Sequence, residues 1–71
     1  MRLLIVDDNR ELAEALAAAF LKRDIRCDIA GTARDAEQLA TTTDYAAMVL
    51  DLGLPDEDGL TLLRRLRAQR R

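Results

Sequence analysis

Cysteine, proline, glycine and aromatic residues are all scarce in this chain of 71 residues. The single cysteine, Cys27, excludes an internal disulfide and is typical of a protein from a reducing cytosol. Proline occurs once and glycine three times, and no segment has the composition of a linker, a repeat or a low-complexity tract. We therefore expect one small domain, near the lower size limit for a self-sufficient hydrophobic core.

Long apolar runs and a strong net charge are also absent from the sequence. No apolar run approaches membrane-spanning length, and the start at residues 1–3 lacks the longer apolar core of a signal peptide. The formal net charge of −2 gives no general attraction for nucleic acid or for a membrane surface. A composition that is 49% hydrophobic and 34% charged argues against disorder. These properties predict a soluble, cytoplasmic globular protein.

Three short segments have the residue patterns of β-strands. Residues 3–6 and 45–50 are continuous apolar runs, which are typical of strands covered on both faces in a parallel sheet. Residues 25–29 alternate strictly between apolar and charged side chains, which indicates a half-exposed strand. That strand is expected at an edge of the sheet.

A helix pattern follows each predicted strand. The first helix begins after an N-cap at Asp8 or Asn9, and Asp8 and Glu11 are spaced as in a capping box. Thr32 is the expected N-cap of a second helix that runs through about Thr42, and a third opens at Gly59. The residues expected on the apolar faces are Leu12, Leu16 and Phe20 with Ala15 and Ala19 beside them, then Ala33, Ala36, Leu39 and Ala40, and finally Leu60, Leu62, Leu63 and Leu66.

The order βαβαβα predicts an α/β fold with a parallel sheet and right-handed crossovers. We expect the strand order 2-1-3, in which the connections leave strand 1 in opposite directions. The carboxyl ends of strands 1 and 3 then form a topological switch point, which is where open α/β sheets bind ligands.

Aspartates follow the two wholly apolar strands at that switch point. Asp7 and Asp8 close the first strand, Asp51 closes the third, and parallel neighbours lie about 4.8 Å apart. Each aspartate alone has a simpler explanation as a solvated strand end, a helix cap or a turn former. Three carboxylates together repel one another unless a proton or a cation lies among them. The group therefore favours a magnesium site with an acidic nucleophile for a phosphoryl group.

The sequence resembles the receiver domain of two-component response regulators at two motifs, LLIVDD at 3–8 and MVLDLGLPDEDGL at 48–60. The second motif is most similar to the branch of transcriptional regulators whose receivers precede a winged-helix DNA-binding domain. The resemblance covers residues 1–71 and implies the N-terminal part of a flavodoxin-like fold with the strand order 2-1-3-4-5. The chain is expected to lack strands 4 and 5, with their Ser or Thr and Lys at the phosphoryl group, and helices 4 and 5.

The resemblance also implies a role for each site residue. Asp51 matches the phosphoacceptor, which takes a phosphoryl group from a sensor histidine kinase in the presence of Mg²⁺. Asp7 and Asp8 match the acidic pair that positions the Mg²⁺ ion, with Asp8 favoured as the direct ligand. The backbone carbonyl of Gly53 matches a further metal ligand. Pro55 matches the family's turn, although loop shape alone also explains a proline there.

Three functions remain open from the sequence. The first is a phosphoacceptor module, a signalling element rather than an enzyme, whose parent controls transcription through a separate DNA-binding domain. The second is a magnesium-dependent phosphohydrolase, which is disfavoured because dehalogenase-like enzymes carry D-x-D after the first strand, whereas Asp7 and Asp8 are adjacent. The third is a structural or engineered half-receiver that is not phosphorylated. Without a fourth strand and a last helix, the edge and one face of strand 3 would be bare, and we expect self-association or swapping of elements there.

Overall fold

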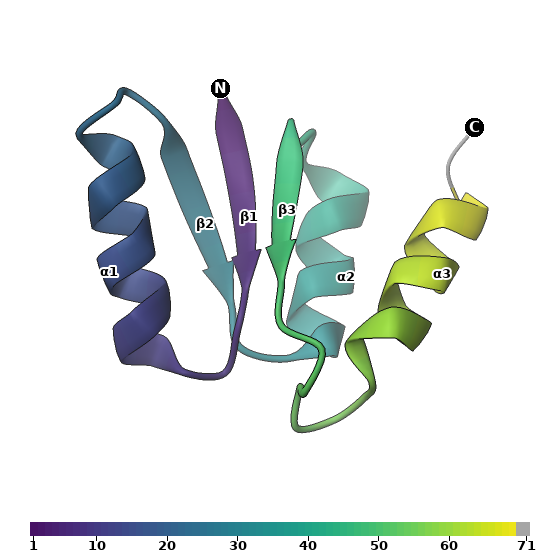
Figure 1. Ribbon diagram of the computed structural model, residues 1–71. Coiled ribbons are helices and arrows are strands. Elements are labelled where there is room, and N and C mark those ends of the chain that lie inside the picture. Colours follow the sequence, from purple (N-terminus) through teal and green to yellow (C-terminus); the bar gives the residue numbers. More distant parts are fainter. Residues whose placement is uncertain (70–71) are drawn as a thin grey trace.

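The computed structural model describes residues 1–69, which form a three-stranded sheet with helices on both faces (Figure 1). Helix α1 packs on one face, and α2 and α3 pack on the other and against each other. The elements follow one another as β1 (Arg2–Val6), α1 (Arg10–Leu21), β2 (Arg26–Ala30), α2 (Ala33–Thr42), β3 (Ala47–Leu50) and α3 (Gly59–Gln69).

The sheet has the predicted order β2-β1-β3, and both pairs of strands are parallel. The central strand β1 aligns Val6 with Ala30 on one side and with Leu50 on the other. Residues 3–6 of β1 are buried because the strand has a neighbour on each edge and helices on each face. The predicted switch point at the carboxyl ends of β1 and β3 is therefore confirmed.

The main core lies between the sheet and helices α2 and α3. Leu4 and Val6 point to this side, so the alternation of a strand turns Leu3 and Ile5 toward α1. Full burial of a leucine or isoleucine side chain contributes about 1.5–3 kcal/mol relative to exposure. The buried cluster on the α2 and α3 side consists of Leu4, Val6, Ala30, Ala33, Ala36, Leu54 and Leu62.

Helix α1 is capped by Asn9, so the capping box predicted for Asp8 with Glu11 is wrong. Asn9 Oδ1 accepts a hydrogen bond from the backbone N–H of Leu12 at 3.1 Å, as an N-cap does. The Asn9 N–H in turn donates to Asp7 Oδ1 at 2.9 Å. This local turn extends the chain past Asp8 before the helix begins and leaves the Asp8 carboxylate out of the cap.

The face of α1 turned toward the sheet also differs from the prediction. Ala13 is fully buried, because a small side chain lets the helix backbone approach the sheet closely. The leucine next to it, Leu12, is therefore turned outward and is 47% exposed. Of the remaining predicted stripe, Leu16 and Phe20 are half-buried, whereas Ala15 and Ala19 are exposed.

The predicted inner faces of α2 and α3 are confirmed except at Leu60. Leu60 is 43% exposed, because Leu62 is fully buried and a residue two positions away lies on the opposite side of the helix. The other residues predicted on these inner faces are buried or half-buried, namely Ala33, Ala36, Leu39 and Ala40 in α2 and Leu62, Leu63 and Leu66 in α3.

None of the helices in the described residues is long and apolar enough to cross a membrane.

Strand β3 is covered on one face only, whereas its apolar run predicted a strand covered on both. Met48 and Leu50 pack against the core beside α2 and α3, but Ala47 and Val49 face solvent, and Val49 is 40% exposed. Within residues 1–69, β3 pairs with β1 alone. In the same part of the chain, the predicted open edge and bare face of β3 are both present.

Asp28 connects all three strands on the α2 side of the sheet. Both of its carboxylate oxygens accept hydrogen bonds from Arg2, at 3.0 and 3.1 Å, and Oδ2 also accepts one from the Tyr45 hydroxyl at 2.6 Å. The Tyr45 hydrogen bond is the largest of the causes that hold the pKa of Asp28 below its ordinary value. Arg2 belongs to β1 and Tyr45 leads into β3, so the carboxylate stabilises the order of the sheet.

Gly59 places the start of α3 directly against the end of β3. Its N–H donates to the carbonyl of Leu52 at 2.9 Å. A Cβ at this position would lie 2.6 Å from the Asp51 carbonyl oxygen and 2.8 Å from the Leu52 Cα. Glycine is therefore required here by close packing of two backbone segments. At Gly31, in contrast, a Cβ would meet nothing within 4 Å.

We expect Tyr45→Phe to lower the free energy of unfolding by about 1 kcal/mol at neutral pH, the usual effect of losing such a hydrogen bond. The ionised Asp28 stabilises the fold at a pH above its unfolded pKa, and this contribution is lost as the pH falls through its lower folded pKa. The difference between wild type and Tyr45→Phe should therefore shrink below about pH 4. Urea unfolding of both proteins, followed by circular dichroism at each pH, measures this difference in the free energy of unfolding.

A matched control for that experiment is Thr41→Val, which removes a hydroxyl that donates to the backbone carbonyl of Gln38. Because that acceptor does not titrate, the effect of Thr41→Val should not change with pH. A Tyr45→Phe effect that is equally independent of pH would contradict the role given to Asp28.

We expect Gly59→Ala to destabilise the chain by about 1–3 kcal/mol, because the added Cβ forces the Asp51 and Leu52 backbone to move. The control Gly31→Ala adds the same methyl group into open space, and its φ is not positive. It should therefore change stability by less than about 1 kcal/mol. Equal urea midpoints for the two variants would show that the close approach at Gly59 is not constrained.

Candidate functional site

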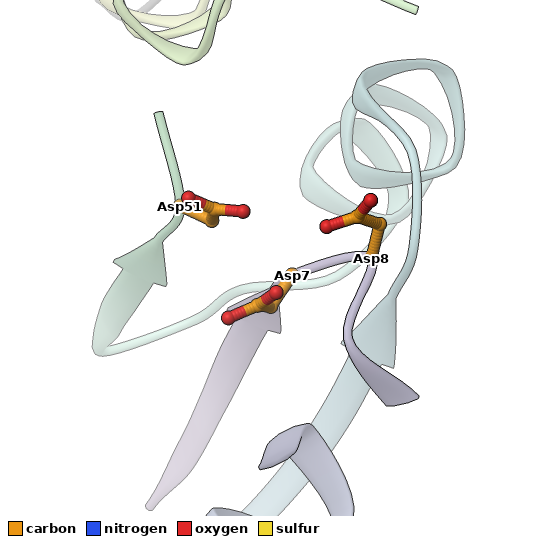
Figure 2. A group of neighbouring side chains, drawn as sticks. All are labelled: Asp7, Asp8 and Asp51. Atoms are coloured by element: carbon orange, nitrogen blue, oxygen red, sulfur yellow. The ribbon is translucent and has the colours of Figure 1, made fainter. Parts of the chain in front are cut away.

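The three aspartates singled out from the sequence lie together at the carboxyl edge of the sheet. Asp7 and Asp8 follow β1, and Asp51 follows β3 (Figure 2). One carboxylate oxygen from each residue lies within 4.8 Å of the other two. The predicted juxtaposition of these side chains is confirmed.

Backbone hydrogen bonds of the sheet continue into two of these residues. The N–H of Asp51 donates to the Val6 carbonyl at 2.8 Å, and the N–H of Asp7 donates to the Ala30 carbonyl at 3.0 Å. Asp7 and Asp51 are half-buried, whereas Asp8, one residue further along, is exposed. The sheet therefore fixes the backbone of two aspartates, and the third reaches the same space from the following turn.

The carboxylates are partly satisfied by backbone donors. Asp7 Oδ1 accepts from the N–H of Asn9 at 2.9 Å, and Asp51 Oδ1 accepts from the N–H of Gly53 at 3.2 Å. Among the ion pairs of residues 1–69, none involves Asp7, Asp8 or Asp51. Three neighbouring negative charges without a basic partner form a site suited to a cation.

The donor set fits a magnesium ion. Mg²⁺ prefers oxygen ligands, takes one or two carboxylates and keeps several waters, and the exposed side of this group is open to water. Asp7, Asp8 and Asp51 would hold the ion through carboxylate oxygens. Neither a histidine, which the sequence lacks, nor the one cysteine contributes to the group.

Gly53 lies two residues after Asp51, in the loop that leads to α3. It is exposed, and it forms an isolated antiparallel bridge with Asp58. No glycine among the described residues has a positive φ, and a Cβ at Gly53 would only touch Asp51 Oδ1 at 3.9 Å. Glycine is therefore not required here by backbone conformation. The role of its carbonyl as a metal ligand remains a prediction.

The contacts that hold the loop after Asp51 were not predicted from the sequence. Asp56 in this loop accepts hydrogen bonds from the N–H groups of Ala33 and Arg34, the first residues of α2. These bonds, that to Ala33 first, lower the pKa of the Asp56 carboxyl. The loop after Asp51 contains three acidic residues, and only the folded chain shows which of them accepts hydrogen bonds from a helix more than twenty residues earlier.

An ion-pair group joins the same loop to both helices. Arg65 of α3 donates to both oxygens of Glu57, at 2.9 and 2.8 Å, and to Glu37 of α2 at 3.1 Å. These carboxylates raise the pKa of the Arg65 guanidinium, and Arg65 lowers that of Glu37. The loop beside the aspartates is thus bonded to α2 and to α3.

Comparison with known proteins identifies the family that has this sequence and fold. The model of the response regulator receiver domain family matches residues 3–71. The transcriptional regulatory protein PmrA of Pectobacterium parmentieri is 49% identical over 67 residues, which are 94% of this chain and 30% of PmrA. The chain thus spans less than a third of the length of this relative.

Solved structures give the same result for the fold. The activated receiver domain of Klebsiella pneumoniae RstA superposes with a TM-score of 0.93 at 30% identity and covers all of this chain, which spans 61% of it. A chain in the complex of histidine kinase ThkA with response regulator TrrA has a TM-score of 0.91 at 25% identity, covering 97% of this chain and 60% of its own length. The predicted partial receiver fold is confirmed, and the chain belongs to the response regulator receiver domain family.

Proposed function

We propose that residues 1–71 are the N-terminal part of a receiver domain and that Asp51 is its phosphoacceptor. The observation that carries this proposal is the group of three carboxylates at the switch point, within 4.8 Å of one another. Asp51 follows the edge strand β3, beside the acidic pair that follows β1. A nucleophilic carboxylate beside a cation site is the arrangement that phosphoryl transfer to aspartate requires.

In this reaction an oxygen of Asp51 attacks the phosphorus of a phosphohistidine. A P–O bond forms, the P–N bond breaks, and the imidazole leaves as an acyl phosphate is formed on the carboxylate. The Gly53 N–H holds Asp51 Oδ1, and within residues 1–69 no hydrogen bond engages the other oxygen, which is the one suited to attack. Mg²⁺ would be held by Asp7, Asp8, Asp51 and the Gly53 carbonyl, and it would offset the negative charge of the phosphoryl group.

The partner proposed for this site is a sensor histidine kinase in the cytoplasm. One structurally similar chain comes from a complex of a histidine kinase with a response regulator. PmrA is a transcriptional regulatory protein more than three times as long as the matched region. We therefore propose that the parent of this chain controls transcription and that a separate domain contacts DNA.

The reaction proposed is a single transfer rather than turnover of a phosphate ester. The adjacent Asp7 and Asp8 lack the D-x-D spacing of dehalogenase-like phosphohydrolases. With Mg²⁺ and a generic phosphate ester, the chain should release phosphate no faster than buffer does.

We expect the chain to take one phosphoryl group from a small phosphodonor such as acetyl phosphate when Mg²⁺ is present, and Asp51→Asn to take none. The matched control is Asp44→Asn, which removes an exposed aspartate at the opposite end of β3 and should leave labelling unchanged. Intact-mass spectrometry measures the added phosphoryl group and its loss with hydroxylamine. Labelling that persists in Asp51→Asn would contradict the assignment, and wild type without label would favour the unphosphorylated half-receiver.

The exposed side of β3 supports a second proposal, namely self-association. Its outer edge presents unpaired backbone groups, and Val49 is 40% exposed on the bare face. A hollow of about 590 Å³ lies on the other face between β3 and helices α2 and α3, and Tyr45, Met48 and Leu66 are among its lining residues. A second copy that adds a strand or exchanges an element would cover this edge.

We expect the wild-type chain to sediment as a dimer or larger species at micromolar concentration, and Val49→Lys to shift it toward monomer. A lysine beside an open strand edge disfavours pairing with another strand. The control Leu21→Lys places the same charge at a leucine that is 58% exposed at the end of α1, away from β3, and should not change association. A sharp monomer peak for wild type, with cooperative melting, would contradict this proposal.

A further inference from the structure

The loop between β3 and α3 is held at several of its residues. Leu54 is buried in the core, and Asp58 Oδ1 accepts from the N–H of Leu60 in the first turn of α3. The Leu52 carbonyl accepts from Gly59, and Glu57 pairs with Arg65. Three of these contacts connect the loop to α3, the helix that follows it, and only Leu54 reaches the core of the sheet.

Asp56 makes the direct hydrogen bonds from the loop to the start of α2, beside the apolar contact of Leu54 with the core. Its Oδ1 accepts from the Ala33 N–H at 2.8 Å, and its Oδ2 accepts from the Arg34 N–H at 3.1 Å. A negative charge at a helix N-terminus is also favoured by the helix dipole. Ala33 is fully buried against the sheet, so the point of attachment is part of the core.

The first turn of α2 depends on Asp56 for half of its donors. Thr32 satisfies the other two, since its Oγ1 accepts from Asp35 and its carbonyl accepts from Ala36. Asp56 thus completes the cap of α2 from a distant loop. The same pair of hydrogen bonds fixes a loop position three residues after Gly53 and five residues after Asp51.

We propose that Asp56 is a positioning residue for the phosphoacceptor site. By bonding to the N-terminus of α2, it holds the loop against the core and so keeps the Gly53 backbone beside the carboxylate of Asp51. This inference deepens the proposed function and rests on it for the metal. Asp56 acts on the affinity of the site for Mg²⁺ by ordering the loop, rather than by a direct contact with the ion.

The experiment must distinguish this role from a purely structural one, in which Asp56 only caps α2. Thr32→Ala removes a cap hydrogen bond from the same helix, the one from the Asp35 N–H, and leaves both hydrogen bonds of Asp56 in place. Asp56→Ala removes two, and with them the attachment of the loop. Asp56→Asn keeps one acceptor oxygen at nearly the same size and serves where the alanine variant does not fold.

The experiment compares these variants in two measurements on the whole chain. Mg²⁺ affinity is measured by calorimetric titration, and order in the loop by hydrogen exchange of the Gly53 and Gly59 amides, both of which donate hydrogen bonds here. We expect Asp56→Ala to weaken Mg²⁺ binding about tenfold, the usual effect of losing a residue that orients a metal ligand. Thr32→Ala should leave the Mg²⁺ affinity within about twofold of wild type. Asp56→Asn should fall between, and only the Asp56 variants should speed exchange at Gly53 and Gly59.

Equal effects of Asp56→Ala and Thr32→Ala on Mg²⁺ affinity and on exchange at Gly53 would overturn the proposal and leave Asp56 a cap. Unchanged exchange at Gly53 in Asp56→Ala would overturn it as well. A wild-type chain that binds no Mg²⁺ would instead count against the proposed function. The exchange comparison needs no metal, so it still decides whether Asp56 orders the loop.

Discussion

The pairing of β1 with β3 is the constraint on which the site depends. The hydrogen bond from the Asp51 N–H to the Val6 carbonyl, at 2.8 Å, extends the parallel ladder one residue past the end of β3. It thereby sets Asp51 beside Asp7. Such a group of like charges opposes folding, and it is tolerated because residues 3–6 of β1 are buried on both faces of the sheet. Burial of the central strand thus stabilises an edge that its own charges disfavour.

The segment after Asp51 shows how a short chain orders a loop. At Gly59 two backbones meet so closely that no side chain fits, and Leu54 enters the core. Polar contacts then complete the attachment, with Asp56 at the start of α2 and Arg65 between Glu57 and Glu37. A phosphoryl or metal site requires this kind of support, because small displacements of its oxygens weaken it.

The same three-stranded architecture leaves β3 with one covered face. Met48 and Leu50 pack on the α2 and α3 side, while Val49 is exposed on the side of α1. An apolar run such as residues 45–50 indicates what a strand can bury but not how many neighbours it has. The prediction of a strand covered on both faces failed for this reason.

The order of the elements, the parallel sheet 2-1-3 and the meeting of Asp7, Asp8 and Asp51 were predictable from the sequence, because apolar runs, caps and crossover rules are local or topological. Tertiary structure alone decided that Leu12 and Leu60 face outward and that Asp56 reaches α2. These features depend on the rotation of a helix against the sheet and on contacts between residues distant in sequence. The spacing of residue types along the chain is compatible with several such rotations and contacts, so it does not select one.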